Sequence, residues 1–252
     1  MMIPRRLTLL AAISLVFTLS QEAKSQWQNG NLALRTNGNM FRSGDQLKVE
    51  ILALEKIDEP FFTQVSYTFS ETVREIDKDG GESTRQEQRT RTRQPGPVIE
   101  SMERFRSIIL DDTFYFGEGN SSGCYGIEVA VFQGYTKECV ARLRSCVFYQ
   151  SSDRSGRECS LYLRSLKRAG SDQWLIFEGA FSERGRYSAL LLRGNRVFKY
   201  IENGVYTGGP RELNIFSDLL TGATGQTYDI LIHDHLNNYS STLARVTIPS
   251  SN

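Results

Sequence analysis

The strongest constraint on the fold is a two-residue alternation of apolar and polar side chains that recurs along the chain. Leu47, Val49 and Ile51 alternate with Lys48 and Glu50. The other stretches with this period are residues 127–131, 161–163, 230–233 and 243–248. Successive side chains of a β-strand point to opposite faces of the sheet, so this period predicts strands that bury one face in a core.

Clusters of Gly, Asn, Asp and Ser separate the alternating stretches. They include NGN at 37–39, DKDGG at 77–81, GNSSG at 119–123 and GGP at 208–210. Short strands at regular spacing with such turn signals are typical of a sandwich or barrel. No convincing amphipathic helix pattern occurs after the N-terminal segment, and only residues 214–220 favour a short helical turn. The predicted fold class is therefore all-β.

Residues 1–25 have a different character. Arg5 and Arg6 precede the uncharged apolar run 7–19, and Ala23 and Ser25 are small residues at the −3 and −1 positions of a cleavage site. This order predicts a cleavable signal peptide and a secreted or periplasmic location. The alternative is an uncleaved N-terminal anchor, although the apolar run is shorter than the roughly 20 residues that a membrane span needs.

Composition narrows the class of protein further. The net charge of +1 argues against nucleic-acid binding. Hydrophobic residues make up 39% of the chain, enough to form real cores. No segment after the N-terminal run is long and apolar enough to predict a transmembrane helix.

Two parts of the chain share an order of features. In each, an apolar stretch is followed by a glycine-rich turn, a tyrosine and an alternating strand. Tyr125 precedes the first of these strands and Tyr228 the second. This order predicts two domains, at 26–150 and 151–252, with a boundary in the polar stretch 151–157.

Two stretches resemble known β-sandwich families. LALRTNGNMFRSGDQLKVEIL, at 32–52, resembles the first two strands of macroglobulin-like or fibronectin-like domains, in which a Gly-Asp turn (Gly44, Asp45) opens an alternating strand. LLTGATGQTYDILIHDHLNNYSSTLARVTIP, at 219–249, is similar to the last two strands of immunoglobulin-like repeats in bacterial exported proteins. The resemblance implies two immunoglobulin-like antiparallel β-sandwich domains, in which such a tyrosine pins a corner. It implies no active site.

Residues 66–93 are polar, rich in charge and interrupted once by a pair of glycines. A hairpin centred on the first glycine places Glu75 opposite Arg85 and Glu71 opposite Arg89. Opposite charges across two strands stabilise a pair by up to about 1 kcal/mol, and a one-residue slip would lose both pairs. We therefore predict a long, solvated β-ribbon.

Arg89, Arg91 and Arg93 fall on one face of the second strand of this ribbon. Such a row of guanidinium groups could bind an anionic polysaccharide. We favour the alternative that the charges keep an exposed sheet edge soluble.

Four cysteines, Cys124, Cys139, Cys146 and Cys159, cluster in one part of the chain. In an oxidising compartment this even number predicts a disulfide framework, whereas zinc would need close C-x-x-C pairs, which are absent. A hairpin turning near residue 135 would place Cys124 opposite Cys146. A hairpin turning near residue 152 would place Cys146 opposite Cys159 and leave Cys124 for Cys139. Both alternatives stay open.

GNSSG matches the G-x-S-x-G pattern of a hydrolase nucleophile, with Ser121 in the nucleophile position. That motif requires a strand-to-helix turn above a parallel sheet, but the next residues, CYGIEVAVF, predict a strand. The catalytic base would have to be His233 or His235, the only histidines. A tight β-turn accounts better for the string.

His233 and His235 would share one face of a strand, where two imidazoles can begin a metal site. A metallo-β-lactamase-like H-x-H-x-D-H pattern would need an acidic residue and a histidine where the chain has Asn237 and Asn238. DKDGGE, at 77–82, starts like a calcium loop but lacks the later ligands, and a hairpin tip accounts for it. We predict no metal and no cofactor.

Trp27 and Trp174 are the only tryptophans. An exposed Trp174 near Tyr187 or Tyr200 would form a platform for a sugar ring, but core packing is the more common role of aromatic residues in sandwiches. We favour core packing.

We therefore expect a non-catalytic exported protein that works through binding or assembly, with an unknown protein or a polysaccharide as partner. The alternatives are a carbohydrate-binding module for an extracellular polysaccharide and a metal-dependent or serine hydrolase. Asn120 and Asn238 begin N-glycosylation sequons, which matter only in a host that glycosylates.

Overall fold

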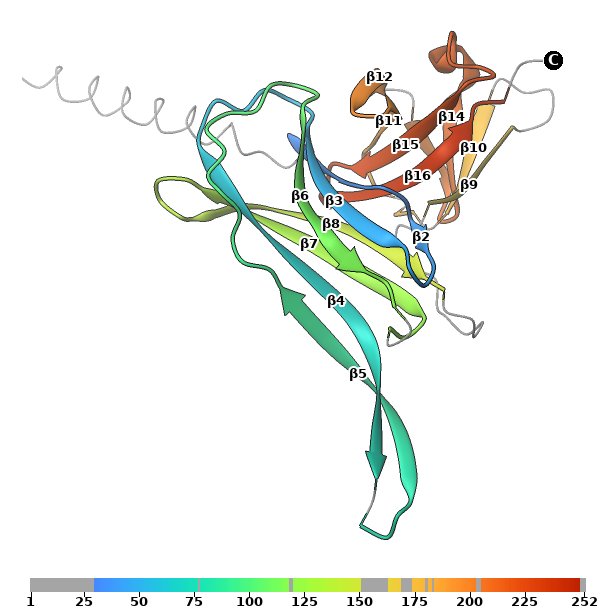
Figure 1. The fold of residues 1–252 in the computed structure, drawn as a ribbon. Coiled ribbons are helices and arrows are strands. Elements are labelled where there is room, and N and C mark those ends of the chain that lie inside the picture. Colours follow the sequence, from blue (N-terminus) through green and yellow to red (C-terminus); the bar gives the residue numbers. More distant parts are fainter. Residues whose placement is uncertain are drawn as a thin grey trace, which may run out of the picture.

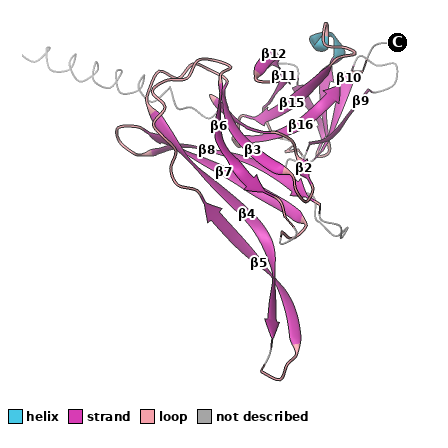
Figure 2. Ribbon diagram, viewed as in Figure 1, coloured by secondary structure: helices cyan, strands magenta, loops and turns pink. Residues whose placement is uncertain are grey.

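The regular structure consists almost entirely of β-strands (Figure 2). The computed structural model describes residues 30–76, 78–117, 120–150, 163–168, 174–179, 181–182, 184–202 and 205–249. In these ranges the one element that is not a strand is the 3-10 helix η1 (Ser217–Leu220), inside the segment where the sequence predicts a helical turn. No helix in the described ranges is long and apolar enough to cross a membrane. The all-β prediction is confirmed.

The strands of the first half of the chain are β1 (Leu32–Thr36), β2 (Met40–Phe41), β3 (Gln46–Ala53), β4 (Phe61–Ile76), β5 (Glu82–Thr92), β6 (Ser107–Tyr115), β7 (Gly123–Gln133) and β8 (Cys139–Tyr149). Those of the second half are β9 (Leu163–Arg168), β10 (Trp174–Gly179), β11 (Tyr187–Arg193), β12 (Arg196–Ile201), β13 (Val205–Gly209), β14 (Glu212–Phe216), β15 (Thr227–Asp234) and β16 (Tyr239–Thr247).

One large sheet runs through both halves of the molecule (Figure 1). Its nine strands lie in the order β12-β11-β15-β16-β8-β7-β4-β5, with β2 paired to β8 off this path. The three-stranded sheet β1-β3-β6 packs on its first half, and the four-stranded sheet β13-β14-β10-β9 packs on its second half. The result is two sandwich-like halves that share a sheet.

The two halves join where β16 runs parallel to β8, with Tyr239 opposite Arg144 and Ser240 opposite Ser145. The sequence predicts two sandwiches in succession and does not predict this shared sheet, because the joining strands are far apart in the chain. The predicted boundary, residues 151–157, lies outside the described residues.

Buried apolar side chains form two main cores and a smaller third one between the halves. The first core takes Leu47, Val49 and Ile51 from β3, as the alternation predicts. The second takes Ile230 and Ile232 from β15. The third joins residues of both halves: Ala33, Leu52, Leu54, Leu190, Leu192 and Leu231. Two separate sandwiches would expose the strand faces that form this third core to solvent.

Tyr125 packs in the first core, and its hydroxyl donates to the backbone oxygen of Ser121, 2.9 Å away. This local bond ties the start of β7 to the turn that precedes it. The hydroxyl of Tyr228, its counterpart in the second half, instead donates to Oε1 of Gln226 over 3.1 Å.

Candidate functional site

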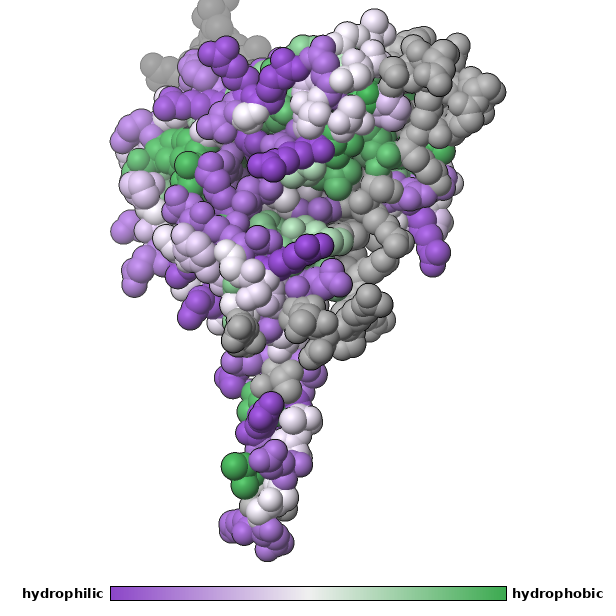
Figure 3. Space-filling model, turned by 45° about the vertical axis from the view of Figure 1, so that its right-hand side comes forward, coloured by the Kyte–Doolittle hydropathy of each residue, from purple (hydrophilic) through white to green (hydrophobic). Residues whose placement is uncertain are grey.

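A two-stranded ribbon extends beyond the end of the nine-stranded sheet (Figure 1). β4 pairs with β7 only over residues 61–68 but pairs with β5 as far as Ile76. Past residue 68 the described sheet therefore has two strands, and the outer edge of each carries backbone groups that no neighbouring strand pairs. In Figure 3 this ribbon is a narrow, mostly hydrophilic projection.

The ribbon contains both ion pairs that the sequence predicts. Arg85 lies 3.0 Å from Glu75, and Arg89 lies 3.4 Å from Glu71. The predicted register is wrong by two residues, because Val73, not Glu75, lies directly opposite Arg85. A shift of two residues keeps every side chain on its face and turns directly opposite pairs into diagonal ones, which long side chains can still span.

The two faces of the ribbon differ in chemistry. One face carries Glu71, Glu75, Arg85, Glu87, Arg89 and Arg91. The other carries mostly hydroxyl and amide groups, with two charges and one large aliphatic residue, at Ser66, Thr68, Ser70, Arg74, Ile76, Glu82, Thr84, Gln86, Gln88, Thr90 and Thr92. On this second face the hydroxyls of Ser66 and Thr92 lie 3.0 Å apart. The sequence shows this division only when the two-residue period of a strand is applied to both β4 and β5.

A buried polar contact anchors the root of the ribbon to β6. Asp111 Oδ2 accepts hydrogen bonds from the Tyr67 hydroxyl and from Arg93 Nε, each at 2.7 Å. Burial favours the neutral carboxyl, but bonds from Tyr67, Thr113 and Arg93 outweigh it and leave the pKa of Asp111 lowered. Burial and this same contact raise the pKa of Tyr67. The anchor fixes the direction in which the ribbon leaves the sandwich.

A cavity of about 210 Å³ lies beside this root. It is lined by Phe69, Ser70, Glu71, Arg91, Phe114, Tyr115, Asn120 and Ser121. Tyr115 ends β6 with 62% of its surface exposed. The sequence singles out Arg91, Asn120 and Ser121 for other reasons, but nothing in the strand pattern distinguishes Tyr115 from a core aromatic residue.

The structure separates the three arginines that the sequence groups together. Arg89 lies 2.8 Å from Glu87 in addition to its contact with Glu71, and Arg93 is paired with Asp111. Arg91 makes no ion pair within the described part of the chain and lines the cavity. The row is therefore largely neutralised by its own carboxylates, and Arg91 is its available cation.

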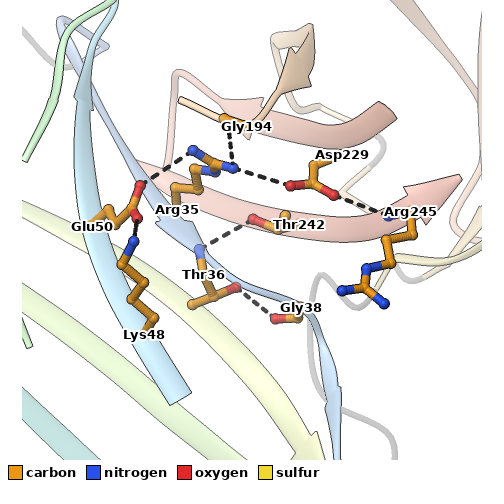
Figure 4. A network of polar contacts seen from close by, with 9 residues as sticks. All are labelled: Arg35, Thr36, Gly38, Lys48, Glu50, Gly194, Asp229, Thr242 and Arg245. Atoms are coloured by element: carbon orange, nitrogen blue, oxygen red, sulfur yellow. Dashed lines mark hydrogen bonds and ion pairs between the residues drawn. The ribbon is translucent and has the colours of Figure 1, made fainter. Parts of the chain in front are cut away.

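A buried ion-pair network fixes the two halves against each other (Figure 4). Arg35 on β1 lies 3.2 Å from Glu50 and 3.1 Å from Asp229 of the second half, and Nη2 also donates to the carbonyl oxygen of Gly194 at 2.9 Å. The side chains of Arg35 and Glu50 are 7% and 5% exposed. Lys48 forms a further ion pair with Glu50. No local sequence pattern indicates this network, because its members come together only in the assembled fold.

Hydroxyl groups of β16 extend the contact between the halves. The backbone N–H of Leu34 donates to Ser240 Oγ over 3.1 Å, and that of Thr36 donates to Thr242 Oγ1 over 3.2 Å. These side chains replace the partner strand that β1 lacks on this edge. These bonds and the Arg35 network therefore join the second half to the sandwich from which the ribbon extends.

The two histidines have structural partners at the end of β15. Nδ1 of His233 lies 2.9 Å from Ser240 Oγ, and Nε2 of His235 lies 2.9 Å from Ser188 Oγ. The pKa of His233 is lowered to about 3, mainly by its complete burial and to a smaller extent by the nearby His235. Among the described residues, no three His, Cys, Asp or Glu side chains gather in a way that could hold a metal.

The remaining motif-like strings lie in turns. Ser121 lies in the turn before β7, and a strand follows it as the sequence predicts. DKDGGE lies at the tip of the ribbon, between β4 and β5, although Asp77 is outside the described residues. Asn238, in the second sequon, is 6% exposed.

The cysteine framework differs from both predicted connectivities. Cys139 is an exposed thiol, and Cys146 is a buried thiol that hydrogen-bonds Tyr239. Cys124 lies opposite Phe148, not Cys146, and is disulfide-bonded. The predicted pairs Cys124–Cys146 and Cys124–Cys139 are therefore wrong, as is any pair that uses Cys146. Cys159 lies outside the described residues.

We expect iodoacetamide to label Cys139 rapidly in the folded protein and Cys146 only after unfolding. Burial raises the pKa of the Cys146 thiol to about 12, and the hydrogen bond from Tyr239 opposes this only in part. At pH 8 only about one such thiol in 10⁴ is ionised, and the thiolate is the reactive form. Time-resolved labelling followed by mass spectrometry measures both rates, and equal rates in the folded protein would contradict the assignment.

The alternative of a sugar platform depends on side chains that the structure describes only in part. The side chain of Trp174 and the whole of Trp27 lie outside the described residues. Tyr187 is buried in the second core, as core packing predicts, and its hydroxyl donates to the backbone oxygen of Ser182 at 3.1 Å. Tyr200 is half-buried against Phe105. Neither tyrosine forms an exposed platform.

Comparison with known proteins gives little further information. No protein-family model matches the chain, and no curated protein matches it. A solved structure with some similarity is the native conformation of E. coli alpha-2-macroglobulin, with 11% sequence identity and a TM-score of 0.25. The match covers 83% of this chain and 13% of the macroglobulin chain. A likeness at this TM-score supports neither a shared activity nor a shared partner.

Proposed function

We propose that the chain is an exported, non-catalytic β-sandwich protein that works by surface binding or assembly, with the β4–β5 ribbon as its contact element. The observation that carries the proposal is the ribbon itself. Beyond residue 68 it has no third strand in the described sheet. The signal-peptide pattern of residues 1–25 supports export.

The chemistry of the ribbon fits a contact surface. Both outer edges offer backbone donors and acceptors to an added strand, which is a common mode of protein recognition. Ile76, near the tip, is 74% exposed although it is a large aliphatic residue. The Asp111 anchor and the Arg35 network hold the ribbon on a rigid support, which lowers the entropy lost on binding.

Shortening the ribbon should abolish binding and leave the fold intact. The variant joins Val73 to Arg85, which lie opposite each other, through an Asn-Gly turn that replaces residues 74–84. The removed residues lie outside the cores, so we expect the free energy of unfolding to change by less than about 1 kcal/mol. Cross-linking in the producing cells, followed by quantitative recovery of the complexes, should show at least a tenfold loss.

Two point variants provide a matched comparison. Ile76→Ser removes an exposed apolar side chain from the ribbon, and Tyr135→Ser removes one that is 80% exposed in the turn between β7 and β8. We expect only the first to weaken complex recovery. If the shortened variant recovers the same complexes in the same amount as the unaltered protein, the ribbon is not the contact element.

A further inference from the structure

We propose that the cavity at the root of the ribbon binds a carboxylated sugar residue, with Arg91 as the ion-pair partner of the carboxylate and Tyr115 as the platform for the sugar ring. The proposal deepens the binding role of the preceding section and rests on it. It names a ligand class for the surface where the ribbon meets the sandwich. Each element of the site comes from a different part of the chain: β4, β5, the end of β6 and the turn before β7.

Arg91 supplies the charge preference. The other arginines on this face of β5 are matched by carboxylates: Arg85 by Glu75 and Glu87, and Arg89 by Glu71 and Glu87. Arg91 has no such partner in the described part of the chain and lines the cavity. A guanidinium group presents a planar fork of donors that matches a carboxylate in bidentate geometry. The cavity therefore favours an anion over a neutral group.

The lining carboxylate does not cancel this preference. Glu71 lines the cavity, but Arg89 lies 3.4 Å from it and offsets part of its charge. Glu71 can still accept hydrogen bonds from hydroxyl groups, because a carboxylate has more acceptor positions than one ion pair occupies. A ligand that carries both a carboxylate and hydroxyl groups would use both side chains.

The rest of the lining favours a sugar ring over an extended peptide. Tyr115 has 62% of its surface exposed and borders a cavity whose other walls combine polar side chains with the aromatic rings of Phe69 and Phe114. Aromatic rings pair an apolar face with a polar tip, which suits a pyranose that has one apolar face and hydroxyl groups around its edge. The amide of Asn120 is already oriented, because its Oδ1 accepts the backbone N–H of Gly117 at 2.7 Å. A cavity of about 210 Å³ holds one ring, not a long segment.

Isothermal titration calorimetry on the full chain tests the site with three probes. They are a galacturonic acid trisaccharide, the neutral galactose trisaccharide of the same length, and a peptide with a free C-terminal carboxylate. We expect heat of binding from the acidic trisaccharide and none from the other two. Arg91→Gln should weaken that binding by about 10- to 100-fold, the range for losing a hydrogen bond to a charged group. Tyr115→Ala should weaken it by at least fivefold.

Arg85→Gln is the matched control, since it alters an arginine on the same strand and face, outside the cavity. It should leave the affinity unchanged. Equal losses for Arg85→Gln and Arg91→Gln would show a general charge effect and overturn the site. Binding of the peptide alone, or no binding of the acidic trisaccharide, would also overturn it.

The shortened ribbon separates this proposal from the preceding one. Replacing residues 74–84 leaves every lining residue in place, so that variant should bind the acidic trisaccharide as the unaltered protein does. If it loses cellular complexes and the unaltered protein binds no trisaccharide, the sugar site fails and the ribbon proposal stands. If trisaccharide binding depends on Arg91 while recovery of the cellular complexes does not depend on the ribbon, the sugar site stands and the ribbon proposal fails.

Discussion

Replacing Arg35 with methionine should lower the free energy of unfolding by about 3 kcal/mol. Removing one partner of a buried ion pair leaves the other charge buried and uncompensated, which typically costs about 3–5 kcal/mol. We expect the lower end of that range, because Lys48 remains paired with Glu50. The substitution also removes the hydrogen bond from Arg35 to the carbonyl oxygen of Gly194, which adds to the loss of stability. Equilibrium unfolding in urea at neutral pH measures the change.

Two variants control for this expectation. Arg85→Gln breaks an ion pair on the ribbon in which both side chains are at least half exposed, and such pairs contribute about 0–1 kcal/mol. Arg35→Lys keeps the charge but loses the fork that reaches Glu50, Asp229 and Gly194 together. Its stability should lie between that of the unaltered protein and that of Arg35→Met. A loss below about 1 kcal/mol for Arg35→Met would show that the network adds little.

Truncating Leu231 to alanine should cost about 2–5 kcal/mol. Leu231 is completely buried in the third core, between the halves, and the cost of such a truncation combines lost transfer free energy with the cavity left behind. Leu236→Ala is the matched control, because Leu236 is 58% exposed. The control should change stability by no more than about 0.5 kcal/mol.

The shape of the unfolding curve carries further information. If the third core joins the halves into one cooperative unit, the unaltered protein unfolds in a single transition when followed by tryptophan fluorescence and by circular dichroism. Leu231→Ala should separate the two probes by weakening that contact. Coincident curves with a loss below about 1 kcal/mol would contradict an energetic role for the third core.

The local part of the fold is predictable from the sequence. Side-chain alternation identifies β3 and β15 because each places its alternating apolar residues on a core face. The pair of glycines identifies the ribbon, and its charges identify both ion pairs. The exact register is not predictable in the same way, because directly opposite and diagonal pairs satisfy the same charges.

The contacts between the halves are not predictable from the same patterns. Glu50 and Leu231 lie on strand faces that alternation assigns to solvent or leaves ambiguous, yet they are 4% and 0% exposed. Their burial depends on β16 pairing with β8, which no local signal encodes. The cysteine prediction fails for a related reason: it pairs residues by assumed turn positions, whereas the observed turn places Cys124 opposite Phe148. The cavity at the ribbon root is not predictable from the sequence either, because it depends on the end of β6 lying close to β5 in the folded protein.

The junction of β1 with β16 has a consequence for the order in which the chain folds. Leu34 and Ser240, which share a hydrogen bond, are 206 positions apart in the chain. Contacts between such distant positions require an entropically costly loop closure and slow the folding reaction. The first half can bury its own core before β16 has left the ribosome, but the free edges of β1 and β8 must wait for that strand. During this interval the waiting edges are open to pairing with other molecules, so docking of β16 is the step at which aggregation competes with folding.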